Sequence, residues 1–406
     1  MVPAVYLLGA TGSIGTQALD VCRDQGLRVA ALAAGGANLD LLATQTAEFQ
    51  PDVVAIADAT REDDLRERLA AAGAGRDFAM PDILVGPDAP AATAARANAE
   101  DTVLNGITGS IGLDSTLAAL ATGARLALAN KESLVVGGAL VTRAMARPGQ
   151  IVPVDSEHSA MFQALAAGHH RRGLCTETVD GTTDVARLVL TASGGPFRGK
   201  TRADLDGVTA EQALAHPTWA MGPVVTVNSS TLMNKGLELI EAQLLFDIDA
   251  ADIDVVVHPQ SIVHSMVTYR DGSTIAQASP PDMRLPIALA LTWPERAYPA
   301  PACTWEQAAT WTFEPVDTAT FPATELARAA VAASPTHPAV LNAANEVCVE
   351  AFLAGNIPYL AIVDTISDVL AAHTWDKART PSRTDLSEVD SWARTSAKER
   401  LTAWRI

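Results

Sequence analysis

The segment VYLLGATGSIG, residues 5–15, decides the fold of the first half of the chain. A short apolar run ends at Gly9, and Gly12 and Gly15 precede a stretch whose periodicity predicts a helix. Glycine at these positions permits a tight turn, close approach of the backbone to a pyrophosphate, and close packing of the helix on the strand. The helix N-terminus adds unpaired N–H groups that suit an anion. The pattern predicts a dinucleotide-binding turn, and a plain topological turn is the alternative.

Short β-prone runs alternate with alanine-rich helical stretches through about residue 155. The predicted strands are Val5–Leu8, Arg28–Ala33, Val53–Ala57, Ile83–Val85, Thr102–Leu104, Leu126–Ala129 and Ile151–Val154. This rhythm predicts an α/β fold in which a Rossmann-like, doubly wound parallel sheet forms a nucleotide-binding domain over residues 1–153.

The residues after the second strand bear on which dinucleotide is bound. They read Ala34-Gly35-Gly36-Ala37-Asn38, with no Asp or Glu to bind a ribose 2′-hydroxyl. This absence favours NADP over NAD. No arginine or lysine follows at once to hold the 2′-phosphate, and Arg61, after the third strand, is the candidate substitute.

Bulk composition excludes several classes of protein. The 406 residues predict two to three domains. A net charge of −18 argues against a general nucleic-acid binder and against an anionic membrane surface. No apolar run approaches the roughly 20 residues of a membrane span, and the N-terminus leads directly into a strand, so a cytoplasmic protein is expected. The four cysteines are scattered without a CxxC pair, which predicts neither a disulfide framework nor a zinc site.

Two polar turns follow the last two strands of the predicted sheet. Asn130-Lys131-Glu132 stands at the carboxyl end of the sheet, where a lysine suits an anion or a carbonyl; a plain helix start is the alternative. In Asp155-Ser156-Glu157, the two carboxylates of an extended segment point the same way and can converge on one hard cation. The alternative makes Asp155 or Ser156 the N-cap of a helix that begins at Ser159.

The segment HPTWAMGPVVTVNSSTLMNKGLE, residues 216–238, is the most informative stretch of the second half. Val224–Val227 predicts a short strand, Asn228–Ser230 offers helix N-cap chemistry, and Leu232–Leu245 has helical periodicity.

On that predicted helix, Asn234, Lys235 and Glu238 share one face. A solvated face is the alternative to a binding site. A cation at Asp155 and Glu157 would need a third ligand from elsewhere in the chain.

The rest of the chain is predicted in less detail. A strand at Arg187–Thr191 runs into Ser193-Gly194-Gly195-Pro196, whose N–H groups could cradle a phosphate or form a simple Gly-Pro turn. A hairpin turn is predicted at Arg270–Gly272. Residues 296–321 are proline-rich and predict a linker, and residues 322–406 predict a C-terminal helical bundle.

Taken together, these motifs closely resemble the 1-deoxy-D-xylulose 5-phosphate reductoisomerase family. The stretches that carry the resemblance are GATGSIG, LANKESLV, PVDSEHSA, TASGGPFRG, residues 216–238, VHPQSIVHSMV, PDMRLPIA and LNAANE. They cover nearly the whole chain. The resemblance implies an oxidoreductase with ketol isomerisation that converts 1-deoxy-D-xylulose 5-phosphate to 2-C-methyl-D-erythritol 4-phosphate in the non-mevalonate isoprenoid pathway. It implies NADPH and one divalent cation (Mg2+, Mn2+ or Co2+) as cofactors, and a homodimer. It also implies that residues 154–295 form a catalytic and dimerisation domain of α+β class, which includes a lid loop.

The resemblance also implies roles for individual residues. It gives catalytic roles to Lys131, Glu157 and His216. It gives the metal to Asp155, Glu157 and Glu238. Substrate contacts fall to Lys131, Ser156, Glu157, Ser193, His216, Trp219, Ser229, Asn234, Lys235 and Glu238. Cofactor contacts fall to Thr11, Gly12, Ser13, Ile14, Gly35, Gly36, Asn38, Asn130, Glu132 and Gly222. Trp219 and Met221 match a lid over the substrate.

The chain departs from the family at three places. Gly36 stands where a basic residue is frequent, Ser279-Pro280 replaces an expected Gly-Glu, and residues 173–184 look like an insertion. Two other functions share parts of the pattern. An aspartate-semialdehyde-type dehydrogenase can share the GATG opening, but it needs a nucleophilic cysteine. A nucleotide-sensing regulator would have an inactive catalytic site. The presence of Asp155, Glu157, Lys235 and Glu238 argues against that function.

Overall fold

The computed structural model of the chain describes residues 3–74, 77–219 and 221–404. These residues divide into two compact units, each assembled from several segments of the chain. Unit 1 comprises the described residues within 1–130, 143–159 and 282–300. Unit 2 comprises those within 131–142, 160–281 and 301–406.

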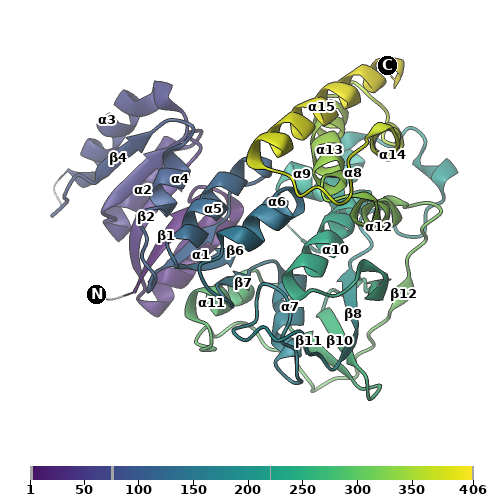
Figure 1. The fold of residues 1–406 in the computed structure, drawn as a ribbon. Helices are drawn as coiled ribbons and strands as arrows, with labels where there is room; N and C mark the ends of the chain where they lie inside the picture. Colours follow the sequence, from purple (N-terminus) through teal and green to yellow (C-terminus); the bar gives the residue numbers. More distant parts are fainter. Residues whose placement is uncertain (1–2, 75–76, 220, 405–406) are drawn as a thin grey trace. The chain divides into compact units, whose positions relative to one another are not determined.

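Unit 1 contains a seven-stranded sheet whose neighbouring strands are all parallel (Figure 1). The strands are β1 Ala4–Leu8, β2 Arg28–Ala34, β3 Val53–Ile56, β4 Asp82–Val85, β5 Thr102–Asn105, β6 Arg125–Leu128 and β7 Ile151–Pro153. Their order is β4-β3-β2-β1-β5-β6-β7, so the sheet extends in opposite directions from β1 and β5. The predicted doubly wound parallel sheet is confirmed, with strand ends within one residue of those expected.

Helices connect these strands. They are α1 Ser13–Gln25, α2 Leu39–Phe49, α3 Glu62–Gly73, α4 Ala89–Ala94 and α5 Leu113–Ala121, with short 3-10 turns at Ala59–Arg61 and Ser110–Gly112. Every residue of β3 and β5 is buried, as expected for parallel strands covered on both faces. Helix α11, Arg284–Thr292, comes from much later in the chain and packs on α1 (Figure 1).

Two helices lead out of the carboxyl edge of this sheet. Helix α6, Lys131–Ala144, follows β6 and is interrupted by Gly138, whose backbone is not helical (φ 17°, ψ −93°). Helix α7, Ser156–Leu165, follows β7. The predicted extended course of Asp155 to Glu157 is therefore wrong, and the helix begins three residues before the expected Ser159. Asp and Ser are favoured at an N-cap and Glu in a first turn, which explains the earlier start.

Unit 2 contains a five-stranded mixed sheet of order β11-β10-β8-β9-β12. Its strands are β8 Val185–Ala192, β9 Ile253–Val257, β10 Val263–Tyr269, β11 Thr274–Ala278 and β12 Glu314–Pro315. Only the β8–β9 pair is parallel among these described strands. The predicted hairpin after Tyr269 is confirmed as the turn between β10 and β11.

The segment around residue 230 differs from the prediction. Val224–Val227 is not a strand but part of α9, Pro223–Ser230. Pro223 occupies the first turn, where its fixed φ suits a helix start, and burial of Val227 outweighs the weak strand preference of valine. Asn228–Ser230 consequently lies inside a helix and caps nothing, so the predicted N-cap is wrong.

Helix α10, Met233–Phe246, agrees closely with the predicted Leu232–Leu245. Its N-cap is Leu232 in the left-handed conformation (φ 60°), with no side-chain cap. The chain therefore passes from α9 to α10 through one strained, buried residue, and the Thr231 hydroxyl accepts a hydrogen bond from the backbone N–H of Met233 at 3.3 Å.

The remaining helices of unit 2 are α8 Ala210–Leu214, α12 Ala323–Ala333, α13 His337–Leu353, α14 Ala361–Ala372 and α15 Arg383–Leu401, with 3-10 turns at Arg202–Leu205, Ala250–Asp252 and Thr402–Trp404. The helical character predicted after residue 322 is confirmed. Within the described ranges, no helix is both long and apolar enough to cross a membrane.

Candidate active site

The glycine turn after β1 has the shape that the sequence predicts. Gly9 has a left-handed φ of 85°, and a Cβ there would lie 2.7 Å from the carbonyl oxygen of Gly106. A Cβ on Gly15 would overlap the carbonyl oxygen of Gly9. Gly12 is the N-cap of α1, and no side chain caps that helix. The first-turn N–H groups beside Thr11, Ser13 and Ile14 therefore suit a phosphate better than a side-chain oxygen.

A second glycine turn lies beside the first and was missed by the sequence analysis. GITGSIG, residues 106–112, differs from GATGSIG, residues 9–15, only at its second position. It follows β5, the neighbour of β1. Ile14 of the first turn packs on Gly106, because a Cβ built on Gly106 would lie 3.3 Å from Cγ2 of Ile14. The amide of Asn130 donates hydrogen bonds to the carbonyl oxygens of Ile107 (2.5 Å) and Gly109 (2.9 Å). The repeated heptapeptide was the signal that could have revealed this second turn.

Four other cofactor candidates have local roles in the fold. Asn38 accepts a hydrogen bond from the backbone N–H of Leu41 at 3.1 Å and so caps α2. Gly36 has a φ of 111°. Glu132 lies in the first turn of α6, and Gly222 is the N-cap of α9. Their contacts to a cofactor, with those of Gly35 and Asn130, stay predictions.

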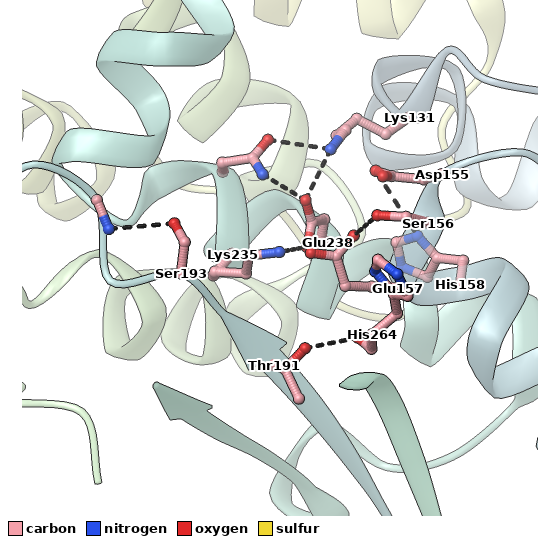
Figure 2. A network of polar contacts seen from close by, with 12 residues as sticks. Lys131, Asp155, Ser156, Glu157, His158, Thr191, Ser193, Lys235, Glu238 and His264 are labelled. Carbon is pink, nitrogen blue, oxygen red and sulfur yellow. Dashed lines mark hydrogen bonds and ion pairs between the residues drawn. The ribbon is translucent and has the colours of Figure 1, made fainter. Parts of the chain in front are cut away.

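The acidic segment of unit 1 forms the start of α7. The Ser156 hydroxyl donates a hydrogen bond of 2.5 Å to Glu157 (Figure 2). His158 is fully buried, and its Nδ1 lies 3.9 Å from Oδ2 of Asp155. Glu157 is in the first turn of α7, so its side chain lies at the positive end of the helix dipole.

Unit 2 holds a cluster formed by Lys131 on α6 and by Asn234, Lys235 and Glu238 on α10, which we call the lysine cluster (Figure 2). Nζ of Lys131 donates to Asn234 and to Glu238, each at 3.0 Å. Lys235 donates to the second carboxylate oxygen of Glu238. The side chains of Lys131, Lys235 and Glu238 are 12%, 7% and 1% exposed. The solvated-face alternative for α10 is therefore wrong.

Ser193 and His216 form a second polar group in unit 2. The Ser193 Oγ lies 3.0 Å from Nε2 of His216, while Nδ1 of His216 accepts from the backbone N–H groups of Thr218 and Trp219. Burial, and then the charge of Lys235, hold the pKa of His216 below its usual value. The imidazole is consequently neutral with its proton on Nε2, directed at Ser193.

The turn that carries Ser193 packs against α9. Gly195 donates its N–H to Ser193 Oγ at 3.2 Å. A Cβ on Gly195 would lie 2.7 Å from the carbonyl oxygen of Ser229, so glycine is required there.

The ring of Trp219 lies 6.1 Å from that of His264. Of the proposed lid, Trp219 and Met221 are described, and Ala220 lies outside the described residues.

The cysteines argue against a thiol nucleophile. Cys22, Cys175 and Cys348 are buried, and burial raises the pKa of the Cys22 and Cys348 thiols to about 12 and that of Cys175 as well. Such thiols are neutral near pH 7 and react slowly. The fold and the two polar groups instead define a dinucleotide-dependent oxidoreductase for a small anionic substrate.

Comparisons with known proteins narrow this class to one family. The family model described as 1-deoxy-D-xylulose 5-phosphate reductoisomerase matches residues 5–138, and two C-terminal domain models of the same enzyme match residues 151–246 and 278–396. The reductoisomerase of Beutenbergia cavernae is 58% identical over 97% of this chain and 96% of its own length. That of Kitasatospora griseola is 55% identical over 97% and 99%.

Solved structures agree. The Zymomonas mobilis reductoisomerase in complex with NADPH superposes with a TM-score of 0.85 at 38% identity, covering 99% of both chains. A reductoisomerase in complex with NADPH, fosmidomycin and magnesium gives 0.86 at 35% identity, covering 98% of both. The chain belongs to the 1-deoxy-D-xylulose 5-phosphate reductoisomerase family. It is an NADPH-dependent enzyme that rearranges and reduces 1-deoxy-D-xylulose 5-phosphate to 2-C-methyl-D-erythritol 4-phosphate.

Proposed function

We propose that this chain carries out its family's reaction with the nucleotide turn of unit 1, the acidic segment of unit 1 and the lysine cluster of unit 2. The lysine cluster carries the proposal. Burying two ammonium groups and a carboxylate costs desolvation energy that their mutual attraction repays only in part. A site that must hold an anionic substrate gives that burial a purpose.

Asp155, Glu157 and Glu238 would hold one divalent cation, Mg2+, Mn2+ or Co2+. Carboxylates are the ligands that such hard cations prefer. The ligand atoms of Asp155 and Glu157 lie within 4.8 Å of each other, so the two carboxylates repel and a cation between them would relieve the repulsion. A solved relative in complex with magnesium supports this assignment. When bound, the ion supplies Lewis acidity and a template for the ketone and its neighbouring hydroxyl.

The substrate phosphate would bind Ser193, Ser229, Asn234, Lys235 and His216. Because the His216 Nε2–H and the Gly195 N–H both point at Ser193 Oγ, the Ser193 hydroxyl hydrogen is left to donate outward. Lys235 adds a positive charge from a buried position, which strengthens its attraction for an oxyanion. Binding energy from this remote group can assist closure over the reacting carbons.

Lys131, Ser156 and Glu157 would contact the reacting part of the substrate. Nζ of Lys131 is already fixed by two hydrogen bonds, so it is oriented before the substrate arrives. Its ammonium group stabilises the negative charge that develops on substrate oxygens during an α-ketol rearrangement. Glu157 and His216 complete the catalytic group that we propose.

The cofactor would lie along the β1 turn, its pyrophosphate on Thr11, Gly12, Ser13 and Ile14, with Gly35, Gly36 and Asn38 on the adenosine side and Asn130, Glu132 and Gly222 as further contacts. The uncapped N-terminus of α1 supports the first part of this assignment. Trp219 and Met221 would close over the substrate and exclude water while the reactive aldehyde awaits hydride.

Other features follow from family membership and are proposed with it. They are a homodimer, a cytoplasmic location, and a division into a cofactor domain (residues 1–153), a catalytic and dimerisation domain (154–295), a linker (296–321) and a helical domain (322–406).

One assay tests the reaction. Oxidation of NADPH is followed by its absorbance in the presence of 1-deoxy-D-xylulose 5-phosphate, with Mn2+ or with EDTA. Turnover that needs both the sugar phosphate and the metal is expected. Reduction of NADP+ with aspartate semialdehyde and phosphate serves as the contrasting reaction. No turnover by folded protein with Mn2+ and substrate present would remove the proposal.

A further inference from the structure

The loop after β2 poses a charge problem that the sequence leaves open. An enzyme that uses NADPH needs a cation near the adenosine ribose to select the 2′-phosphate. The residues from Gly35 to Asn38 contain none, and Asn38 spends its side-chain oxygen on capping α2. A cation must therefore reach this loop from another element.

Gly36 itself is closed to a basic side chain. Its φ of 111° is a conformation that residues with a Cβ rarely adopt. A Cβ there would also lie 3.1 Å from the Cβ of Asp58, at the end of β3. The usual solution, a lysine or arginine at this position, thus conflicts with the backbone of this chain.

Arg61, in the turn after β3, places its guanidinium against this loop. Nη1 donates to the carbonyl oxygen of Gly36 at 2.6 Å and to that of Ala37 at 3.4 Å. Nη2 donates to Asp64 at 2.5 Å. These bonds use three of the five N–H donors of a guanidinium, and the described residues occupy neither Nε–H nor the second Nη2–H. Two donors remain for a ligand.

The acidic neighbours orient this guanidinium. Asp64 is shared between Arg61 and Arg68, and Arg68 also pairs with Asp40. Asp58, which could otherwise accept a bond from a ribose hydroxyl, directs Oδ1 at the backbone N–H and hydroxyl of Thr60. A carboxylate anchor on one edge of an arginine fixes the other edge for a second anion.

We propose that Arg61 binds the 2′-phosphate of NADPH and gives this enzyme its preference for NADPH over NADH. The inference rests on the proposed cofactor site and adds to it a specificity-determining residue contributed by the turn after β3 rather than by the loop after β2.

Nucleotide titration of the full-length enzyme tests the assignment. Kd values are measured for NADPH, NADH, adenosine 2′,5′-bisphosphate and 5′-AMP. Arg61→Gln is expected to raise the Kd values for NADPH and the bisphosphate by about 10- to 100-fold, because charge-assisted hydrogen bonds are lost. The Kd values for NADH and 5′-AMP should change by no more than about twofold. Arg61→Lys keeps the positive charge but loses the planar pair of N–H donors, so its Kd for NADPH should lie between those of the wild type and Arg61→Gln.

Arg66→Gln is the matched control, because Arg66 lies on α3, the helix that begins directly after Arg61, and pairs only with Glu62 among the described residues. It should leave all four affinities unchanged. An equal loss for NADPH and NADH in Arg61→Gln, or an unchanged ratio, would overturn the assignment. Turnover of the wild-type enzyme at saturating NADPH is recorded in parallel, so that failure of the reaction is distinguished from failure of this residue.

Discussion

Glu238 is the residue on which the site depends most. Its carboxylate is almost fully buried, and it accepts hydrogen bonds from Lys131, Asn234 and Lys235. Two ammonium groups therefore balance the charge of a carboxylate that is buried away from water. Removing the charge would leave two buried lysines without their anion.

Replacement of Glu238 by glutamine is predicted to abolish metal-dependent turnover while NADPH binding stays close to that of the wild type. The amide is a poor ligand for a hard cation, whereas the nucleotide turn belongs to the other unit. Steady-state rates with Mn2+ and a separate NADPH titration measure the two effects. Glu325→Gln, an exposed glutamate on α12, is the control. Unchanged turnover in Glu238→Gln would take this residue out of the metal site.

His264 is predicted to make stability depend on pH. Burial lowers the pKa of His264 to about 4, against an ordinary value of 6.5. Between these values the unfolded chain binds a proton that the folded chain rejects. The stabilisation is therefore fully present above pH 6.5 and is lost as the pH falls to about 4.

The measurement is the free energy of unfolding in urea at pH 7 and at pH 4. Between the two, the wild type should lose about 3 kcal/mol more than His264→Gln. Glutamine can still donate to the carbonyl oxygen of Ser279, which His264 contacts at 3.1 Å. Parallel pH profiles for the two proteins would contradict the assignment.

At the level of elements, α10 packs closely on α12 through Gly236. A Cβ there would lie 3.0 Å from the carbonyl oxygen of Ala323 and 3.1 Å from the Cβ of Ala327. Glycine inside a helix costs roughly 1 kcal/mol relative to alanine, so the close approach has to repay that cost.

Gly236→Ala is predicted to lower the free energy of unfolding by about 1 kcal/mol, because the overlap with α12 exceeds the gain in helix propensity. Chemical denaturation measures the change. The sign is decisive, since propensity alone would raise stability by a similar amount.

The elements also mark the limits of reading this sequence. Every strand of the parallel sheet was predicted from a short β-prone run bounded by glycine or polar residues, such as Arg28–Ala33. The prediction succeeded because the residue preference for strand and the burial of the segment agree there. Val224–Val227 failed because tertiary burial, with Pro223 before it, outweighed residue preference. The prediction that the carboxylates of Asp155 and Glu157 point the same way assumed an extended segment. These residues instead begin α7, because Asp and Ser are favoured at helix N-caps.

The site was predictable to a different degree. One face of α10 with Asn234, Lys235 and Glu238 follows from helical spacing alone. Its burial does not, because burial depends on which elements cover that face. The bond from Lys131 joins residues more than a hundred positions apart, and no local pattern encodes it.

At the scale of the whole molecule, the four thiols report on both units. Cys22 belongs to unit 1, and Cys175, Cys303 and Cys348 belong to unit 2. Only Cys303 of the four is not buried.

In the folded protein at pH 8, one thiol is predicted to react rapidly with Ellman's reagent and three slowly. The three buried thiols are both inaccessible and hard to ionise. All four should react at once in guanidinium chloride, and Cys303→Ser should lose the fast phase. A second fast thiol in the native protein would contradict the buried placement of its cysteine.

The engagement of Glu238 by Lys131 and Lys235 has a thermodynamic consequence. A divalent ion that takes this carboxylate competes with two ammonium groups, and an anion that draws those groups to itself weakens the competition. If Glu238 holds the ion as proposed, metal and phosphorylated substrate are expected to bind with positive coupling, which Mn2+ titrations with and without inorganic phosphate would measure. Linkage makes the coupling reciprocal, so the ion raises the affinity for the anion by the same factor as the anion raises that for the ion.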